Sequence, residues 1–142
     1  MRKIDTLVIH CSDSLQGRGD NAVTIDRWHE ERGFKRTYKG QEYHIGYHYV
    51  ILEDGSIEVG RPLEISGAHA RGYNTSSIGI CLIGKHEFTE KQFISLGTLV
   101  SGMAEQFSIS NENIKGHYQV DTHGKTCPNF DIAEFMNKYV LS

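Results

Sequence analysis

Two short, uninterrupted apolar runs limit the fold of this chain most strongly. Residues 6–11 read TLVIHC and residues 77–83 read SIGICLI, and both runs are rich in β-branched side chains. Runs of this length are short for a helix and are typical of strands buried within a sheet. We therefore expect a central β-sheet that contains both runs.

A hairpin and three helices complete the predicted domain. Residues 47–52 (YHYVIL) and 57–59 (IEV) flank the turn sequence EDGS, which predicts a hairpin. Helices are predicted over 24–32, over 89–107 after a capping box of Thr89 and Gln92, and over 131–139. No repeat or linker divides the chain. The sequence predicts one mixed α/β domain over residues 1–142, with a central sheet flanked by about three helices.

Charge and composition exclude several classes of protein. The 142 residues carry 15 Lys and Arg against 18 Asp and Glu, a net charge of −3, which argues against nucleic-acid binding through phosphates. Three cysteines make a disulfide framework improbable. The N-terminus has no signal-peptide pattern, and no run reaches the roughly 20 apolar residues of a membrane span. We expect a monomer made in the cytoplasm, without nucleic-acid or membrane partners.

Eight histidines are the first indication of chemistry. His10 ends the first apolar run, while His117 and Cys127 lie in the glycine-containing segment GHYQVDTHGKTCP at 116–128. Imidazole and thiolate suit zinc, and three protein ligands with one open position are typical of a catalytic zinc site. Taken singly, residues of these types are more often structural, His10 as a buried core histidine and Cys127 as a small buried apolar residue. The spacing leaves both interpretations open, and His123 is a rival ligand.

Four segments together carry a resemblance to a known family. They are VIHCS at 8–12, GYHYVI at 46–51, GAHARGYNTSSIGICLIG at 67–84 and GHYQVDTHGKTCPNFD at 116–131. The chain resembles the type 2 N-acetylmuramoyl-L-alanine amidases, in the branch that includes the lysozymes of T-odd phages and the related peptidoglycan recognition proteins. The resemblance runs from about Thr6 to Phe135, so it implies that fold for nearly the whole chain.

The resemblance implies a zinc amidase that cleaves the bond between N-acetylmuramic acid and L-alanine in peptidoglycan. His10, His117 and Cys127 would bind one Zn²⁺ per chain, with Cys127 where other branches of the family use aspartate. Tyr47 matches the catalytic tyrosine, and Lys125 matches the lysine of the phage branch. If the segment is extended, Lys125 and Cys127 point to the same side, because residues two apart share a face of a strand.

Other polar residues receive weaker assignments. His69 and Asn74 lie in the loop GAHARGYN, which the family uses along its substrate cleft, so they are predicted to bind substrate or to stabilise the turn. Alternation along a strand would place His48 on the opposite side of the sheet from Tyr47. Two further histidines and two cysteines are assigned no role in catalysis: His29, His86, Cys11 and Cys81.

Several functional classes stay open at this point. The chain is predicted to be a phage or prophage endolysin, which reaches the cell wall through a pore made by another protein. A cytoplasmic amidase of muropeptide recycling is the second context. A non-catalytic peptidoglycan-binding module is a different class, against which the full set of three ligands argues. A cysteine hydrolase, with Cys127 as nucleophile and His117 as base, is a third class.

The stretch between Gly33 and Tyr47 is longer than in the phage pattern. Within it, RTYKGQEY at 36–43 predicts a short hairpin or an ordered loop around Gly40. We hypothesise that this segment forms one wall of the substrate groove.

Overall fold

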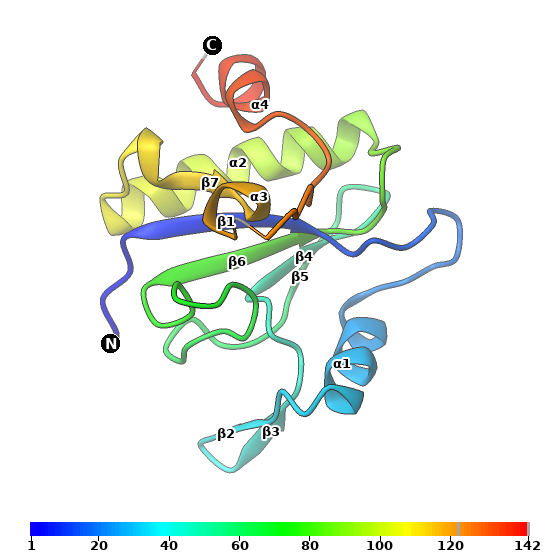
Figure 1. Ribbon diagram of the computed structural model, residues 1–142, viewed down its shortest axis with the longest axis vertical. Helices are drawn as coiled ribbons and strands as arrows, with labels where there is room; N and C mark the ends of the chain where they lie inside the picture. Colours follow the sequence, from blue (N-terminus) through cyan, green and yellow to red (C-terminus); the bar gives the residue numbers. More distant parts are fainter. Residues whose placement is uncertain (122, 142) are drawn as a thin grey trace.

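The computed structural model describes residues 1–121 and 123–141, and its centre is a five-stranded mixed sheet (Figure 1). The strand order is β5-β4-β6-β1-β7. β1 pairs in parallel with β6 and β7, β6 pairs in parallel with β4, and β5 is antiparallel to β4. The strands are β1 Thr6–Cys11, β4 Tyr49–Ile51, β5 Ile57–Val59, β6 Ser77–Leu82 and β7 Ile114–Gly116. Both apolar runs are buried strands, as predicted.

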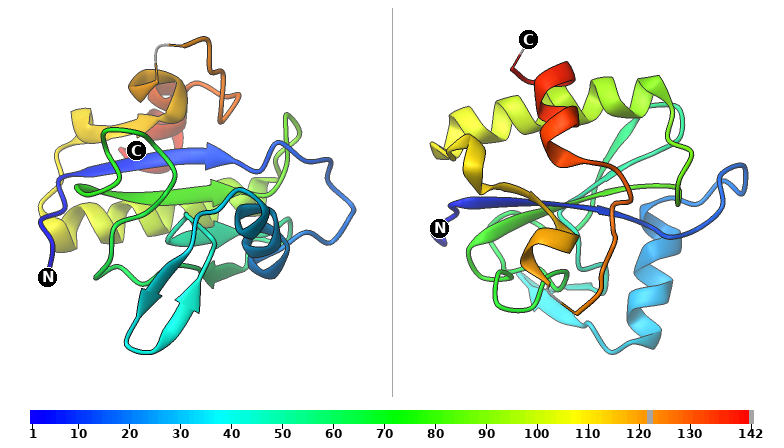
Figure 2. Two further views of the ribbon diagram at one scale, coloured as in Figure 1. Left: turned by 60° about the horizontal axis from the view of Figure 1, so that its bottom comes forward. Right: turned by 45° about the horizontal axis from the view of Figure 1, so that its top comes forward.

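Helices cover the two faces of this sheet unequally. In Figure 2, α2 and α4 lie over one face, and α1 lies on the other side. The helices are α1 Ala22–Glu31, α2 Glu90–Phe107, the single turn α3 His117–Val120 and α4 Ile132–Tyr139, with a 3-10 turn η1 at Asn111–Asn113. The three longer helices confirm the sequence prediction. β7, η1 and α3 were not predicted, because each is too short to show a period.

Two boundaries differ from the sequence prediction. α1 begins two residues before Thr24, because Asn21 is the N-cap and Thr24 is its capping-box partner. The strand predicted from residue 47 begins at Tyr49, so Tyr47 and His48 precede β4. The capping box of Thr89 and Gln92 is present as predicted.

Alternation along the strands separates two apolar clusters. Leu7 and Ile9 of β1 face the larger cluster, which α2 and α4 complete with Leu96, Val100 and Phe135. The smaller cluster lies on the α1 face and contains Ile25, Ile45, Val50, Cys81 and Ile83. Because residues two apart share a face, His10 lies on the opposite face from Ile9. The face that bears His10 is therefore the one that α2 and α4 leave uncovered.

The additional stretch before Tyr47 forms a separate hairpin, as predicted. β2 (Arg36–Tyr38) pairs antiparallel with β3 (Gln41–Tyr43) around Lys39 and Gly40, which both have positive φ. Figure 2 shows this hairpin apart from the five-stranded sheet. Lys35 and Glu42 form an exposed ion pair of 3.2 Å at its base.

None of the helices in residues 1–121 and 123–141 is both long enough and apolar enough to cross a membrane.

Replacing Thr89 with alanine tests how the longest helix is held. The Thr89 hydroxyl accepts a hydrogen bond from the Gln92 N–H (3.1 Å) and donates to the Glu53 carbonyl (2.8 Å). Thr89→Ala should lower the free energy of unfolding by about 1 kcal/mol, the usual cost of losing an N-cap. Thr98→Ala, the same change at an exposed position inside α2, should leave it unchanged or slightly raised. Urea denaturation measures both, and equal losses would contradict the capping role.

Candidate active site

A cavity of about 700 Å³ opens on the α1 face beside the carboxyl end of β1. Four parts of the chain and Tyr47 line it: residues 11–13 at the end of β1, the end of α1 and the residues after it, the loop 68–74, and residues of 117–121 and 124–129. Six of the seven residues that the sequence singled out line the cavity: Tyr47, His69, Asn74, His117, Lys125 and Cys127. His10 lies beneath them, 1% exposed.

His10, His117 and Cys127 converge as the resemblance implies. Each offers one ligand atom, and the three atoms lie within 4.8 Å of one another. The ring centroids of His10 and His117 are 4.5 Å apart. The rival His123 is directed elsewhere: its side chain is 91% exposed, and its Nδ1 lies 3.0 Å from Asp121 Oδ1. The predicted set, without His123, is thus the one the fold assembles.

The register of the sheet explains this convergence. Ile9 of β1 is the partner of Gly116 in β7, so the residues that follow them, His10 in β1 and His117 at the start of α3, lie side by side. Gly116 is required here, because a Cβ at that position would lie 2.6 Å from the Tyr118 ring. The pairing of β7 with β1 therefore places the second histidine next to the first.

Both histidines are suited to bind a metal. Burial, with smaller contributions from neighbouring positive groups, lowers the pKa of His10 well below its ordinary value. Burial and the Lys125 ammonium also lower the pKa of His117. The imidazoles are therefore neutral at pH 7, which is the form that ligates metals.

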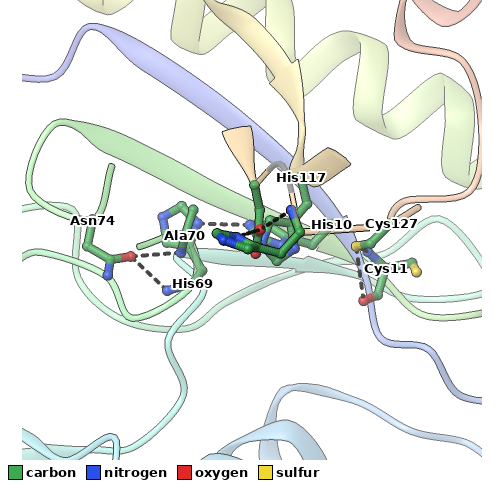
Figure 3. Close-up of polar contacts among 9 residues, drawn as sticks. His10, Cys11, His69, Ala70, Asn74, His117 and Cys127 are labelled. Atoms are coloured by element: carbon green, nitrogen blue, oxygen red, sulfur yellow. Dashed lines mark hydrogen bonds and ion pairs between the residues drawn. The ribbon is translucent and has the colours of Figure 1, made fainter. Parts of the chain in front are cut away.

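Cys127 is held by the end of β1. The backbone N–H of Cys11 donates a hydrogen bond of 3.1 Å to Cys127 Sγ, and Figure 3 shows the two cysteines side by side. Contact with the Cys11 side chain, together with burial, raises the pKa of the Cys127 thiol. In the metal-free protein the thiol keeps its proton, which a bound metal would displace.

Tyr47 lies directly against the histidines. Its ring centroid is 4.9 Å from that of His10 and 5.3 Å from that of His29. Burial raises the pKa of Tyr47 well above its ordinary value, so its hydroxyl stays protonated and is a hydrogen-bond donor, with the Cys81 side chain as a neighbour.

Lys125 lines the same cavity from the short link between two turns, at 123–124 and 127–128. The segment around it is not a strand. Lys125 and Cys127 nevertheless both face the cavity. The Lys125 charge lowers the pKa of both histidines, which reflects its proximity to them.

The segment that leads into Tyr47 is fixed by residues that sequence reasoning left unassigned. His29 is buried, and its Nδ1 accepts a hydrogen bond of 2.8 Å from the Gly46 N–H. Arg61 is also buried and donates to the carbonyls of Ile45, Phe34 and Ser66. Burial lowers the pKa of His29 to about 4, so it accepts as a neutral ring. No local pattern marks an arginine that binds three distant carbonyls.

His48 is structural, as predicted, but it does not lie across the sheet from Tyr47. It is fully buried, its Nδ1 accepts from the Gly79 N–H at 3.0 Å, and its ring centroid is 6.0 Å from that of His69. Alternation fails here because both residues precede β4. Cys11 and Cys81 are buried, as predicted.

The loop 67–76 is built around His69. Asn74 Oδ1 accepts hydrogen bonds from the backbone N–H groups of His69 (2.8 Å) and Ala70 (2.9 Å) (Figure 3). The His69 ring packs on two glycines: a Cβ on Gly67 or on Gly79 would lie 2.5 Å or 2.7 Å from the ring. The loop thus holds this ring in one place, and Asn74 has the turn-stabilising role that the sequence left open.

The hairpin of β2 and β3 does not form a wall of this cavity. Arg32 and Phe34, which precede the hairpin, line the cavity, whereas none of residues 36–43 does. The hypothesis of a groove wall at 36–43 is therefore wrong, because the hairpin extends away from the strands that carry the site.

Adding one methyl group tests the packing of the His69 ring. Gly79→Ala should lower the free energy of unfolding by about 1–3 kcal/mol, the usual cost of overpacking. Gly102→Ala is the matched control: it lies in α2 with no described atom within 4 Å of the added Cβ, and it should stabilise the helix slightly. Chemical denaturation separates the two, and a neutral Gly79→Ala would show that the ring can move aside.

Known proteins share this fold and this order of segments. The family model for N-acetylmuramoyl-L-alanine amidase matches residues 1–130. The endolysin of Escherichia phage T7 is 31% identical over 145 residues, with 96% of this chain and 88% of the endolysin covered.

Solved structures agree with these relatives. The N-acetylmuramoyl-L-alanine amidase LysC from Clostridium intestinale URNW has a TM-score of 0.80 at 29% identity. The match covers 96% of this chain and 85% of the LysC chain. Drosophila PGRP-LB shares the fold, with a TM-score of 0.74 at 24% identity and coverage of 98% and 82%. The match over residues 1–130 and the convergence of the four motifs at one cavity establish that the chain belongs to the N-acetylmuramoyl-L-alanine amidase family.

Proposed function

We propose that the protein is a zinc-dependent N-acetylmuramoyl-L-alanine amidase that hydrolyses the bond between N-acetylmuramic acid and L-alanine in peptidoglycan. The observation that carries the proposal is the meeting of His10, His117 and Cys127 at one end of a cavity that Tyr47 and Lys125 also line. The relation to the T7 endolysin supports action on the cell wall during phage lysis, after another protein opens a path through the membrane.

The ligand set fits zinc rather than a hard cation. Two neutral imidazoles and a thiolate are nitrogen and sulfur donors, and three protein ligands leave one position for water or substrate. A zinc ion held there supplies Lewis acidity, which polarises a carbonyl and lowers the pKa of water.

The other residues act on the substrate. Attack on an amide builds negative charge on its carbonyl oxygen, and Tyr47 and Lys125, which both line the cavity, would supply a hydroxyl and an ammonium as donors to that oxygen. Arg32 and Arg71 line the same cavity and add positive charge suited to the carboxylates of a peptide stem. The site thus favours an anionic muramyl-peptide.

The cysteine-hydrolase alternative is not supported. A nucleophilic cysteine needs a lowered pKa and a base within hydrogen-bond reach. The pKa of Cys127 is raised, and its thiol is engaged with the backbone and side chain of Cys11. We assign His117, which lies close to Cys127, as a second metal ligand and not as a general base.

Metal analysis tests the proposed cofactor. The purified protein should hold about one zinc per chain, lose amidase activity on chelation and regain it with zinc. Cys127→Ala should lose both metal and activity, because a ligand is removed. Cys81→Ala is the control: Cys81 is buried in β6 outside the ligand set, so its replacement should keep the zinc. Full activity of the metal-free enzyme would refute zinc dependence.

The roles of Tyr47 and Lys125 are separable from metal binding. Tyr47→Phe and Lys125→Ala should each lower turnover by about 10²- to 10³-fold, the usual effect of removing one donor to a developing oxyanion. Zinc content should not change, since neither residue is a ligand. Lys91→Ala, an exposed lysine on α2 at the opposite face of the sheet, should keep full turnover. The masses of products released from purified peptidoglycan identify the bond cleaved, and normal turnover of Lys125→Ala would make this lysine a surface charge only.

A further inference from the structure

A chain of hydrogen bonds runs from His10 into the interior of the protein. His10 Nε2 lies 2.8 Å from His69 Nδ1, and His69 Nε2 lies 3.1 Å from the hydroxyl of Ser77. The Ser77 hydroxyl lies 2.7 Å from the carbonyl oxygen of Tyr73. His10 and Ser77 are almost completely buried, and His69, which lines the cavity, is partly buried between them.

The last bond fixes the direction of the whole chain. A carbonyl only accepts, so the single hydroxyl proton of Ser77 is donated to Tyr73. Ser77 must then accept from His69, which places the His69 proton on Nε2. His69 Nδ1 is consequently an acceptor, and His10 donates to it from Nε2.

We propose that His69 is a positioning residue that holds His10 in the tautomer protonated at Nε2 and thereby presents the lone pair of His10 Nδ1 to the metal. The proposal rests on the metal site proposed above. It gives His69 a role other than substrate binding, because both of its ring nitrogens already have partners inside the protein.

The surroundings of the His69 ring support this role independently. Gly67 and Gly79 leave room for the ring and no more, and Asn74 fixes the backbone of His69 through two N–H groups. Figure 3 shows His69 between Asn74 and His10. Ligating histidines commonly donate their second N–H to a carboxylate, a carbonyl or water. Here a neutral ring takes that place, and a serine sets the orientation of its proton.

The tautomer can be tested without metal. In metal-free wild-type protein at neutral pH, long-range ¹H–¹⁵N correlation spectra of labelled histidine should show both His10 and His69 protonated at Nε2 and bare at Nδ1. Ser77→Ala removes the acceptor of His69, and His69 should then become a mixture of tautomers. A His10 ring protonated at Nδ1 in wild-type protein would overturn the proposal.

Zinc affinity provides the second readout, measured by competition with a chelator. His69→Phe keeps a ring between Gly67 and Gly79 but removes the nitrogen that accepts from His10. Zinc affinity should therefore fall by about 10- to 100-fold, the usual effect of losing the hydrogen-bond partner of a metal-binding residue. Ser77→Ala, which keeps the His69 ring, should lower affinity by about tenfold, the lower end of that range. Ser76→Ala is the control: its side chain makes no hydrogen bond within residues 1–121 and 123–141, and its affinity should equal wild type.

The outcomes separate this proposal from the proposed function. Wild-type zinc affinity in both His69→Phe and Ser77→Ala would refute the positioning role and leave the zinc amidase intact. Failure of wild-type protein to bind zinc would refute the metal site, while the spectra of the metal-free protein would still report the tautomer. If His69→Phe does not fold, Ser77→Ala and the wild-type spectra decide the question.

Discussion

Burial of His10 is the constraint on which the site depends. The residue is the last but one of β1, lies between β6 and β7 and is 1% exposed, so its ring nitrogens rely on the protein and the adjoining cavity for partners. A buried polar atom without a partner costs about 1–3 kcal/mol. His69 is the partner of Nε2, which leaves Nδ1 for the metal proposed to be shared with His117 and Cys127. The proposed metal would thus be the partner of the second nitrogen.

One face of the sheet carries the main apolar core, and the other carries the candidate site. α2 and α4 pack on one face in a continuous apolar cluster, which supplies most of the buried hydrocarbon. The other face carries a small apolar cluster and several buried polar side chains, among them His29, His48 and Arg61. These three hold backbone groups of the segments around Tyr47 and Gly79. On this face, hydrogen bonds from buried polar side chains, in place of apolar packing, hold the backbone around the open cavity.

The sequence was sufficient for what is encoded locally. The apolar runs, the capping box at Thr89 and the hairpin at 36–43 depend on neighbouring residues, and all three were predicted. The three ligands could be grouped only because a family resemblance linked distant motifs. The partner of His69 lies 59 residues away, and Arg61 binds carbonyls 16 and 27 residues away, so no local pattern reveals them. The face of His48 was predicted wrongly for the same reason: it depends on where pairing with β6 begins.

The register of β1 therefore determines the proposed metal site twice. Its residue His10 is one proposed ligand, and the next residue, Cys11, supports a second, Cys127, through its backbone N–H. Pairing of Ile9 with Gly116 sets the third ligand, His117, beside the first. A slip of one residue would turn His10 to the face covered by α2 and α4 and would also move His117 away from it. Since the apolar residues of β1 alternate with His10, the same hydrophobic burial that fixes the register also fixes the geometry of the ligands.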